Sequence, residues 1–323
     1  MGNVSPSPEI VVAGEALIDL FLDDPRRPTA LPGGSPANTA IALARLGTPV
    51  AFACRFGADR FGELLRDNLA ANDVDLRYAV NAPEPTSLAV VTRGADGGPT
   101  YGFHVSGTAD WAWRPAELPH DLPQNVLAVH AGSLALALQP GATVLAEWFA
   151  AQRADRVTSL DPNVRPALVG PRESYAPRLT ALWAAADIVK VSVEDLDWVF
   201  PDEDAITVAQ RLQQDLGTAL VVVTLGGDGA VALHNGRTYR RPAAPVSVVD
   251  TVGAGDTFSA GLLHWLAEHG SLRRGALDAL TEHEIELALE FAATAAGLAC
   301  TRPGADPPDR AAVTAALRRT PPA

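Results

Sequence analysis

The feature that most constrains the fold of this chain is a regular exchange between two apolar periods. Short runs of consecutive apolar residues alternate with longer segments in which apolar residues recur every three or four positions. The first pattern is typical of strands buried on both faces and the second of helices that cover a sheet. The alternation therefore predicts an α/β fold with a mainly parallel sheet and helices on both sides. The strand-like runs lie near 9–13, 49–53, 126–130, 156–160, 186–191, 219–224 and 229–233, and the helical patterns near 37–46, 59–71, 141–153, 175–185, 204–216, 254–268, 284–299 and 309–318.

Two segments do not fit this alternation. Residues 17–32 and 84–112 contain short β-type runs that are separated by turn residues. We interpret both as insertions that form a small β-sheet lid at the ligand end of the domain. The domain itself is expected to span residues 9–318, with flexible ends at 1–8 and 319–323.

Composition limits the class of protein. The chain has 323 residues, 47% of them hydrophobic, which is enough for the core of one large α/β domain. Its net charge of −13 disfavours a surface for nucleic acid. Two distant cysteines, Cys54 and Cys300, argue against a disulfide scaffold and fit a reducing cytoplasm. We expect no secretory signal and no membrane span, because the first apolar run lacks a basic lead and the stretch 126–151 is interrupted by polar and turn residues.

The segment 250–261, Asp-Thr-Val-Gly-Ala-Gly-Asp-Thr-Phe-Ser-Ala-Gly, is the most informative motif. It predicts a turn that becomes a helix, with the N–H groups of Gly253, Ala254 and Gly255 converging on one point. The helix dipole adds positive potential there, which suits an anion such as phosphate. Asp256 would stand beside that anion as an acceptor for a hydroxyl proton, so the motif indicates phosphoryl transfer to an alcohol. The alternative is an ordinary loop with an acidic residue in the first helical turn.

A second glycine-rich turn, at Gly33 and Gly34, precedes an apolar-periodic helix that contains Asn38 and ends at Gly47. The glycines allow a ligand to approach the backbone closely, and Asn38 offers both a donor and an acceptor. Upstream, an apolar run leads into polar residues that include Asp19. In a parallel sheet the ligand crevice lies beyond the carboxyl ends of the strands, which is where we expect these residues.

Lys190 is the only lysine among 25 basic residues and lies at the end of a strand-like run. A compact ammonium binds phosphate as a point charge. The alternative is that a single lysine remains by chance in an arginine-rich composition. No glycine precedes Lys190 as a Walker A loop requires, and Phe258 takes the third glycine place of a dinucleotide fingerprint. No histidine or cysteine cluster has metal-ligand spacing.

Together the two glycine-rich motifs resemble the two signatures of the PfkB/ribokinase family of sugar kinases. The resemblance extends over almost the whole chain and is closest to the fructokinase branch. It implies a ribokinase-like three-layer αβα domain with a mainly parallel central sheet and a small β-sheet lid, which often makes homodimer contacts. Further segments that follow in the expected order are Gly14–Asp19, Phe56–Gly62, Asp161–Arg165, Lys190–Ser192, Thr224–Gly227 and Thr301–Ala305.

The resemblance implies in-line transfer of the γ-phosphoryl group of ATP to a sugar hydroxyl, which needs positioning and charge neutralisation more than covalent chemistry. Asp256 would accept the hydroxyl proton, and the N–H groups of Gly253, Ala254 and Gly255 would stabilise the transferring group. The residues that the resemblance assigns to the sugar hydroxyls are Asp19, Gly33, Gly34 and Asn38.

Other candidates have equally ordinary alternatives. Arg165 could clamp the substrate or the γ-phosphate, or it could be a surface residue. Phe103 could present apolar surface to the sugar, or it could belong to the core of the lid. The candidates for nucleotide binding lie at predicted strand ends, and they are Lys190, Ser192, Thr224, Gly226 and Gly229. For all of them except the lysine, the alternative to nucleotide binding is that the residue type simply suits a turn at the end of a strand.

Mg²⁺ should accompany ATP and be held mostly by phosphates and water. Many family members carry Asn-x-x-Glu after the strand that ends at Lys190, whereas this chain has Ser192-Val-Glu194-Asp195. Either Glu194 or Asp195 could organise metal-bound water. Some members also bind a monovalent cation such as K⁺ through backbone carbonyls, which by position belong here to Asp250, Val252, Ala299 and Gly304.

The resemblance favours D-fructose as substrate and fructose 6-phosphate as product. A 2-keto-3-deoxygluconate kinase is an alternative in the same reaction class, with Arg165 or Arg93 as partner of the acid group. An alternative outside the enzymes is a catalytically silent protein with a sugar-binding or regulatory role. The expected partners are therefore ATP and a sugar, with no nucleic acid and no membrane.

Overall fold

The structure is a computed structural model that describes residues 9–22, 26–93 and 99–319. The flexible ends predicted at 1–8 and 319–323 lie outside these residues, apart from Arg319. The side chain of Arg93, one predicted partner of an acid substrate, is also outside the described part.

A central sheet of eight strands runs through the described part of the chain in the order β14-β13-β12-β11-β10-β9-β1-β4. The strands from β12 to β4 are parallel to one another, and β13 and β14 are antiparallel. The mainly parallel sheet predicted from the apolar runs is thus confirmed. Its strands are β1 (Glu9–Ala13), β4 (Val50–Ala53), β9 (Val126–Gly132), β10 (Val157–Asp161), β11 (Ile188–Ser192), β12 (Leu220–Thr224), β13 (Ala230–His234) and β14 (Arg237–Arg241).

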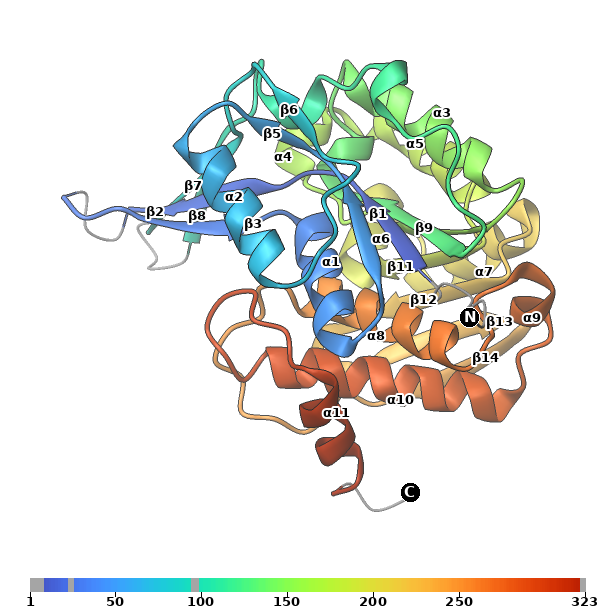
Figure 1. The fold of residues 1–323 in the computed structure, drawn as a ribbon. Helices are drawn as coiled ribbons and strands as arrows, with labels where there is room; N and C mark the ends of the chain where they lie inside the picture. Colours follow the sequence, from blue (N-terminus) through green and yellow to red (C-terminus); the bar gives the residue numbers. More distant parts are fainter. Residues whose placement is uncertain (1–8, 23–25, 94–98, 320–323) are drawn as a thin grey trace, which may run out of the picture.

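Helices cover both faces of this sheet, because successive strand residues point to opposite sides. In β1, Ile10 and Val12 pack in one buried cluster with α1, α8 and α10. Val11 and Ala13 pack in a second buried cluster with α3, α5 and α7. Figure 1 shows the resulting three layers. The helices are α1 (Ser35–Leu46), α2 (Arg60–Ala71), α3 (Gly141–Gln152), α4 (Pro166–Val169), α5 (Arg172–Ala184), α6 (Val193–Val199), α7 (Ala205–Leu216), α8 (Ala254–Glu268), α9 (Arg274–Asp278), α10 (Glu282–Ala299) and α11 (Arg310–Leu317).

A second, four-stranded sheet projects from the domain on the left of Figure 1. Its order is β3-β2-β7-β8, and β2 and β7 are parallel whereas the two outer pairs are antiparallel. The small sheet predicted from the β-type runs is therefore present. Its strands are β2 (Leu17–Phe21), β3 (Thr29–Gly33), β7 (Leu88–Arg93) and β8 (Pro99–His104), and β5 (Arg55–Gly57) and β6 (Val80–Ala82) form a separate pair.

Strand β14 was not anticipated, because it reads Arg-Thr-Tyr-Arg-Arg and lacks an apolar run. It joins β13 through Asn235 and Gly236, which both have left-handed backbone angles (φ 48° and 73°). Asn-Gly is the strongest short-range signal for a two-residue hairpin. That dipeptide, rather than apolar periodicity, was the signal that could have predicted the strand.

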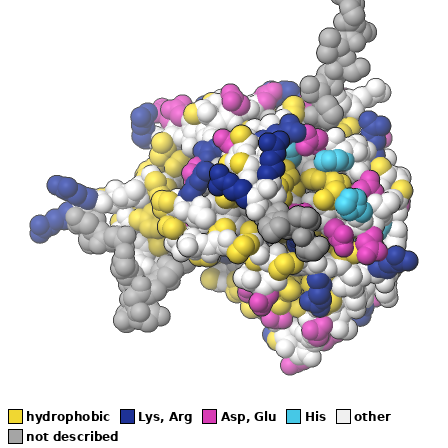
Figure 2. Space-filling view, turned by 90° about the horizontal axis from the view of Figure 1, so that it is seen from below, with side chains coloured by type: hydrophobic (Ala, Val, Ile, Leu, Met, Phe, Trp, Pro, Cys, Tyr) yellow, Lys and Arg dark blue, Asp and Glu magenta, His cyan; other side chains and the backbone are white. Residues whose placement is uncertain are grey.

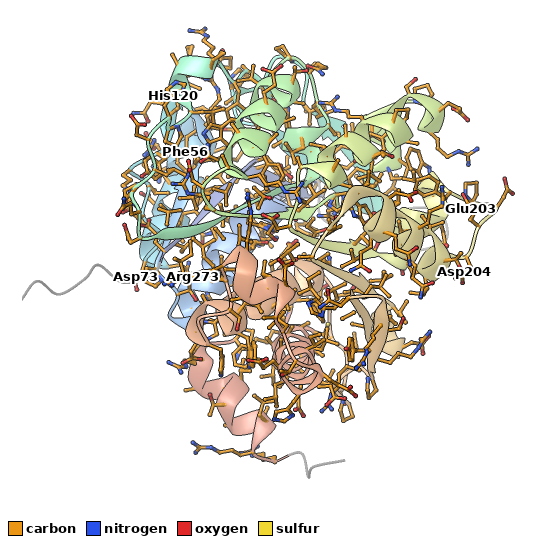
Figure 3. The ribbon with its side chains drawn as sticks, turned by 90° about the vertical axis from the view of Figure 1, so that its right-hand side faces the viewer. Phe56, Asp73, His120, Glu203, Asp204 and Arg273 are labelled. Atoms are coloured by element: carbon orange, nitrogen blue, oxygen red, sulfur yellow. The ribbon has the colours of Figure 1, made fainter. Side chains whose placement is uncertain are left out.

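Charged groups are spread over the surface and the helix ends. Figure 2 shows acidic and basic side chains interspersed over the face seen from below. At the start of α7, Asp204 accepts a hydrogen bond from the Thr207 amide at 2.9 Å and lies with Glu203 at the rim of the molecule (Figure 3). Among residues 9–22, 26–93 and 99–319, the helices are all too short or too polar to cross a membrane.

We expect the Leu43→Ala substitution to destabilise the fold strongly. Leu43 in α1 is fully buried (0% exposed), so truncation leaves a cavity and should lower the free energy of unfolding by about 2–5 kcal/mol. Urea denaturation measures this change. The matched control is Leu64→Ala in α2, since Leu64 is 36% exposed and should change stability by less than about 1 kcal/mol. Equal losses for the two variants would contradict the assignment of the core.

Candidate active site

The carboxyl ends of the parallel strands and the N-termini of α1 and α8 surround a cavity of about 720 Å³. This is the edge where ligands bind in open parallel sheets. The cavity brings together segments that are more than 200 residues apart in the chain, as the contact between Asn38 and Asp256 shows. The predicted site residues that line it are Asp19, Gly34, Asn38, Phe103, Arg165, Lys190, Val252, Gly253, Gly255 and Asp256.

Asp256 lies in the first turn of α8 and is buried. The Ser35 hydroxyl donates to its Oδ1 at 2.6 Å, and the Asn38 amide donates to its Oδ2 at 2.9 Å. Burial raises the pKa of Asp256 above its ordinary value, against the opposing effect of these two hydrogen bonds and of Lys190. The carboxylate is thus held in one orientation by donors from α1 while its basicity is increased.

The turn before α8 has the conformation expected of an anion-binding loop. Gly253 adopts a left-handed φ of 74°, and a Cβ atom there would come within 2.9 Å of the Ala305 side chain. The amides of Gly253 and Gly255 have no acceptor in the part of the chain that the structure describes. The Ala254 amide differs, because it donates to the Thr251 carbonyl at 3.2 Å.

Lys190 lies beneath this turn. Its Nζ donates to Asp161 Oδ2 at 2.9 Å, and a Cβ atom on Gly255 would be 2.9 Å from that Nζ. Burial lowers the pKa of Lys190, but the adjacent Asp161 carboxylate outweighs burial and holds this pKa above its usual value. The side chain is therefore a charged ammonium next to the start of α8, as a phosphate-binding role requires.

The small sheet supplies the opposite wall. Asp19 in β2 faces the cavity, and the absence of a side chain at Gly33 makes room for it, since a Cβ there would be 2.2 Å from Asp19 Oδ2. Burial raises the pKa of Asp19 to about 6, and the Arg165 guanidinium opposes this shift. Arg165 is exposed and donates to Asn163 Oδ1 at 2.6 Å. Phe103 in β8 lines the same cavity.

The predicted nucleotide-side residues other than Lys190 lie at neighbouring strand ends and do not line this cavity. Ser192 caps α6 by accepting from the Asp195 amide at 3.1 Å. Gly229 has φ 99°, and a Cβ there would meet the Arg241 carbonyl at 2.0 Å. Thr224 is the last residue of β12, and Gly226 lies in the turn that joins β12 to β13. Turn chemistry therefore accounts for the residue types at Ser192 and Gly229.

The two candidate metal carboxylates differ in environment. Asp195 is buried, and its two oxygens accept from the amides of Val164 at 2.9 Å and Ser192 at 3.3 Å. Burial raises the pKa of Asp195. Glu194 is exposed. Within the described residues there is no group of three or more His, Cys, Asp or Glu side chains arranged to hold a metal ion.

The segments named for a monovalent cation lie side by side. The Gly304 amide donates to Asp250 Oδ2 at 2.8 Å, and the Val252 amide donates to Asp250 Oδ1 at 3.0 Å. The Asp250 amide donates to the Cys300 carbonyl at 3.2 Å, and the Ala299 carbonyl accepts from the Arg302 amide at 3.1 Å. Asp250 thus ties the loop before α8 to the loop after α10.

Sequence reasoning gave no role to three residues that the structure places at the site. Ser35 and Asp161 hold Asp256 and Lys190, respectively. Glu15 lines the cavity, and its carboxylate accepts from the Ala135 amide at 3.0 Å. Asp161 and Glu15 stand at the end of β10 and just after β1, so a charged residue directly after an apolar run was the signal that could have identified them.

The buried Glu15 should make stability depend on pH. Burial raises its pKa to about 7, so between about pH 4.5 and pH 7 the folded state binds this proton more tightly than the unfolded state, and stability falls as pH rises. We expect the free energy of unfolding of the wild type, relative to Glu15→Gln, to fall by about 1–3 kcal/mol from pH 5 to pH 8. Urea titrations at both pH values measure it. A constant difference would show that Glu15 titrates at an ordinary pKa.

Comparison with known proteins identifies relatives of this chain. The sequence profile described as "pfkB family carbohydrate kinase" matches residues 7–312. A fructokinase from Rhizobium leguminosarum bv. trifolii is 39% identical over 285 residues, which cover 85% of each chain. The crystal structure of a fructokinase from Xylella fastidiosa with bound ATP superposes with a TM-score of 0.89 at 32% identity, covering 97% of this chain and 99% of that one. A double-mutant fructokinase from Vibrio cholerae O395, bound to fructose, ADP and potassium ion, gives a TM-score of 0.84 at 29% identity, again covering 97% and 99%.

Proposed function

This chain belongs to the pfkB family of carbohydrate kinases, and on that basis we propose that it transfers the γ-phosphoryl group of ATP to the 6-hydroxyl of D-fructose. Carbohydrate kinases are phosphotransferases with an alcohol group as acceptor. The observation that carries the proposal is the buried Asp256 carboxylate, which two donors from α1 hold at the start of α8, inside a cavity that the small sheet and the turn before α8 line. Fructose as substrate is supported by the fructokinases among its relatives.

Asp256 acts as the base in this proposal. The sugar oxygen forms a bond to the γ-phosphorus, the bond from that phosphorus to ADP breaks, and the hydroxyl proton passes to the carboxylate. The raised pKa brings the base closer to neutral pH, and its fixed orientation places it for proton transfer.

Negative charge on the transferring group is stabilised by the turn before α8. The amides of Gly253 and Gly255, the dipole of α8 and the Lys190 ammonium all present positive charge to the same region. The Ala254 amide joins them only if it leaves the Thr251 carbonyl. The remaining nucleotide contacts are assigned to Ser192, Thr224, Gly226 and Gly229.

The sugar is held by short polar side chains and by the glycine turn before α1, which suit a polyol. The proposed contacts are Asp19, Gly33, Gly34, Asn38, Phe103 and Arg165. The sugar-side wall favours a neutral sugar over 2-keto-3-deoxygluconate. Asp19 and Glu15 line the cavity, the Arg165 guanidinium is exposed and already bonded to Asn163, and the Lys190 ammonium is paired with Asp161.

Magnesium is proposed as the ion that accompanies ATP, with phosphates and water as most of its ligands. Glu194 is the better candidate to hold metal-bound water, because both oxygens of Asp195 already accept amide hydrogen bonds. A potassium ion is proposed at the carbonyls of Asp250, Val252, Ala299 and Gly304, two loops that hydrogen bonds already join.

Further proposals concern the domain, the lid, the oligomeric state and the location of the protein. Residues 9–318 form the kinase domain, whose small sheet is a lid that closes over the sugar and excludes water, and this lid joins two copies into a homodimer. The edge strand β3, where Leu31 is 42% exposed, supports the homodimer. A cytoplasmic location is supported by two free cysteines in the described chain.

The first test is ADP release by purified protein with Mg-ATP across fructose, ribose and 2-keto-3-deoxygluconate. We expect strong release with fructose and at least tenfold lower kcat/KM with the sugar acid, because the cationic groups of the cavity already bond to Asn163 and Asp161 and leave the acid group without a partner. Release with the acid alone would favour the alternative kinase. No release with any sugar, despite ATP binding, would favour a silent sugar-binding protein. Activity that persists when a large organic cation replaces K⁺ would remove the potassium proposal.

The Asp256→Asn variant tests the catalytic base. It should lower kcat by about 10²–10⁴-fold, because the amide cannot accept the hydroxyl proton, while calorimetric affinities for fructose and ATP stay within about threefold. The matched control is Asp187→Asn, at a buried carboxylate whose Oδ2 accepts from the Thr158 amide at 3.0 Å outside the cavity. A near wild-type rate for Asp256→Asn would refute the assignment.

A further inference from the structure

The small sheet forms its wall of the cavity with residues that alternate along its strands. Leu17, Asp19 and Phe21 of β2 and Ala89 and Val91 of β7 all line the cavity. Neighbouring residues of a strand point to opposite faces, so a shift of one residue would turn this set away from the sugar. The position of Asp19 therefore depends on the register of β2 against β7.

That register has to be fixed where the two strands begin, at the residues Ala16 before β2 and Ser87 before β7, which we call the strand roots. Strands β2 and β7 are parallel, with Ile18 opposite Leu88, and parallel neighbours cannot be joined by a tight turn. Their roots lie side by side where they leave the main domain, since the Ile18 amide donates to the Ser87 carbonyl at 3.1 Å. A group that bonds both roots would fix the register.

Asp110 is such a group. It lies in the 3₁₀ turn η1 (Ala109–Trp111) and reaches both roots with its two carboxylate oxygens. The Ala16 amide, directly before β2, donates to Oδ1 at 3.0 Å, and the Ser87 hydroxyl, directly before β7, donates to Oδ2 at 2.5 Å. The two oxygens of one side chain thus connect two strands that the sequence separates by about 70 residues.

Asp110 is only 1% exposed and does not line the cavity. Burial raises its pKa to about 6, and the nearby Arg55 guanidinium opposes this. Arg55 in β5 is itself buried, and its Nε donates to the Ala109 carbonyl at 2.9 Å. A buried carboxylate costs free energy that an apolar residue of similar size would avoid. A carboxylate is nevertheless suited to this position, because its two oxygens accept one hydrogen bond from the root of each strand.

We propose that Asp110 is a positioning residue for sugar binding, which fixes the register of β2 and β7 and so holds Asp19 against the sugar. It acts through β2 and touches neither sugar nor nucleotide. The inference rests on the proposed kinase function, because the effect is measured on sugar affinity.

The test compares Asp110→Ala and Asp110→Asn with Asp187→Asn, the control at the other buried carboxylate. We expect Asp110→Ala to raise KM for fructose by about tenfold or more while KM for ATP stays within about twofold. Asp110→Asn should have a smaller effect, because its amide oxygen still accepts from the Ala16 amide. Asp187→Asn should lower Tm without changing either KM. Equal rises in both KM values, or an unchanged KM for fructose in folded Asp110→Ala, would overturn the proposal.

Hydrogen exchange separates failure of this proposal from failure of the proposed function. The β2 amides, including that of Ile18, should exchange at least about tenfold faster in Asp110→Ala, while those of β11 keep their protection. This readout needs no substrate. If Asp110→Ala does not fold, Ser87→Ala is used instead, because it removes one of the two hydrogen bonds to Asp110. We then expect the same faster exchange of the β2 amides and a KM for fructose that is about twofold higher. Unchanged β2 exchange in the folded variant tested would overturn the proposal even in an active kinase.

Discussion

A parallel sheet covered by helices on both faces can present polar side chains only at its ends, and the candidate site depends on this constraint. The interiors of β1 and β12 are apolar and buried, and those of β9 and β11 are apolar apart from His130 and Lys190, so most polar groups stand where these strands stop. The helices α1 and α8 begin at the same edge, and their first turns add amides and a carboxylate. Topology therefore explains why residues from eight separate segments meet in one cavity.

The site also has to balance charge away from water. The ammonium of Lys190 interacts with the carboxylates of Asp161, Asp195 and Asp256, which together exceed its charge. Burial raises the pKa of Asp256 and of Asp195, and repulsion by the Asp161 carboxylate adds to this shift, so both resist ionisation. The surrounding carboxylates hold the pKa of Lys190 above its usual value against the effect of burial, so Lys190 keeps its proton. Hydrogen bonds from Ser35, Asn38 and backbone amides offset part of the free energy that is lost when these carboxylates are removed from water. A phosphate entering this region adds negative charge, so it must bring a cation or meet free amide donors.

The fold was largely predictable from sequence, because the periods of apolar residues report burial directly. The parallel core and the small sheet followed from those periods. Strand β14 was missed because its basic edge carries no such period. The left-handed turn at Gly253 and the position of Asp256 in the first turn of α8 were predictable, because a glycine-rich run directly before an apolar-periodic segment indicates a turn that becomes a helix. Contacts such as Ser35 with Asp256 were not, since 221 residues separate them and nothing local to either position specifies the other.

The same limit applies to glycines and acids whose role depends on a distant neighbour. Gly229 needs no side chain because the Arg241 carbonyl would meet it, a fact that only the hairpin reveals. Asp110 sits in a segment that looks like part of the lid, whereas its oxygens serve the roots of two strands. The role of such a residue can be recognised only when the fold shows which distant group it contacts.

The solitary lysine has a consequence for the chemistry of the whole molecular surface. The basic groups on the outside of this protein are guanidinium groups, since the one side-chain amine in the sequence is buried beneath the turn before α8. Acylating reagents that modify amines would find, apart from the chain terminus, a single target inside the cavity. Acylation of that amine would be slow, because Lys190 keeps its proton beside Asp161, and lysine cross-linking would find no side-chain amine on the outer surface.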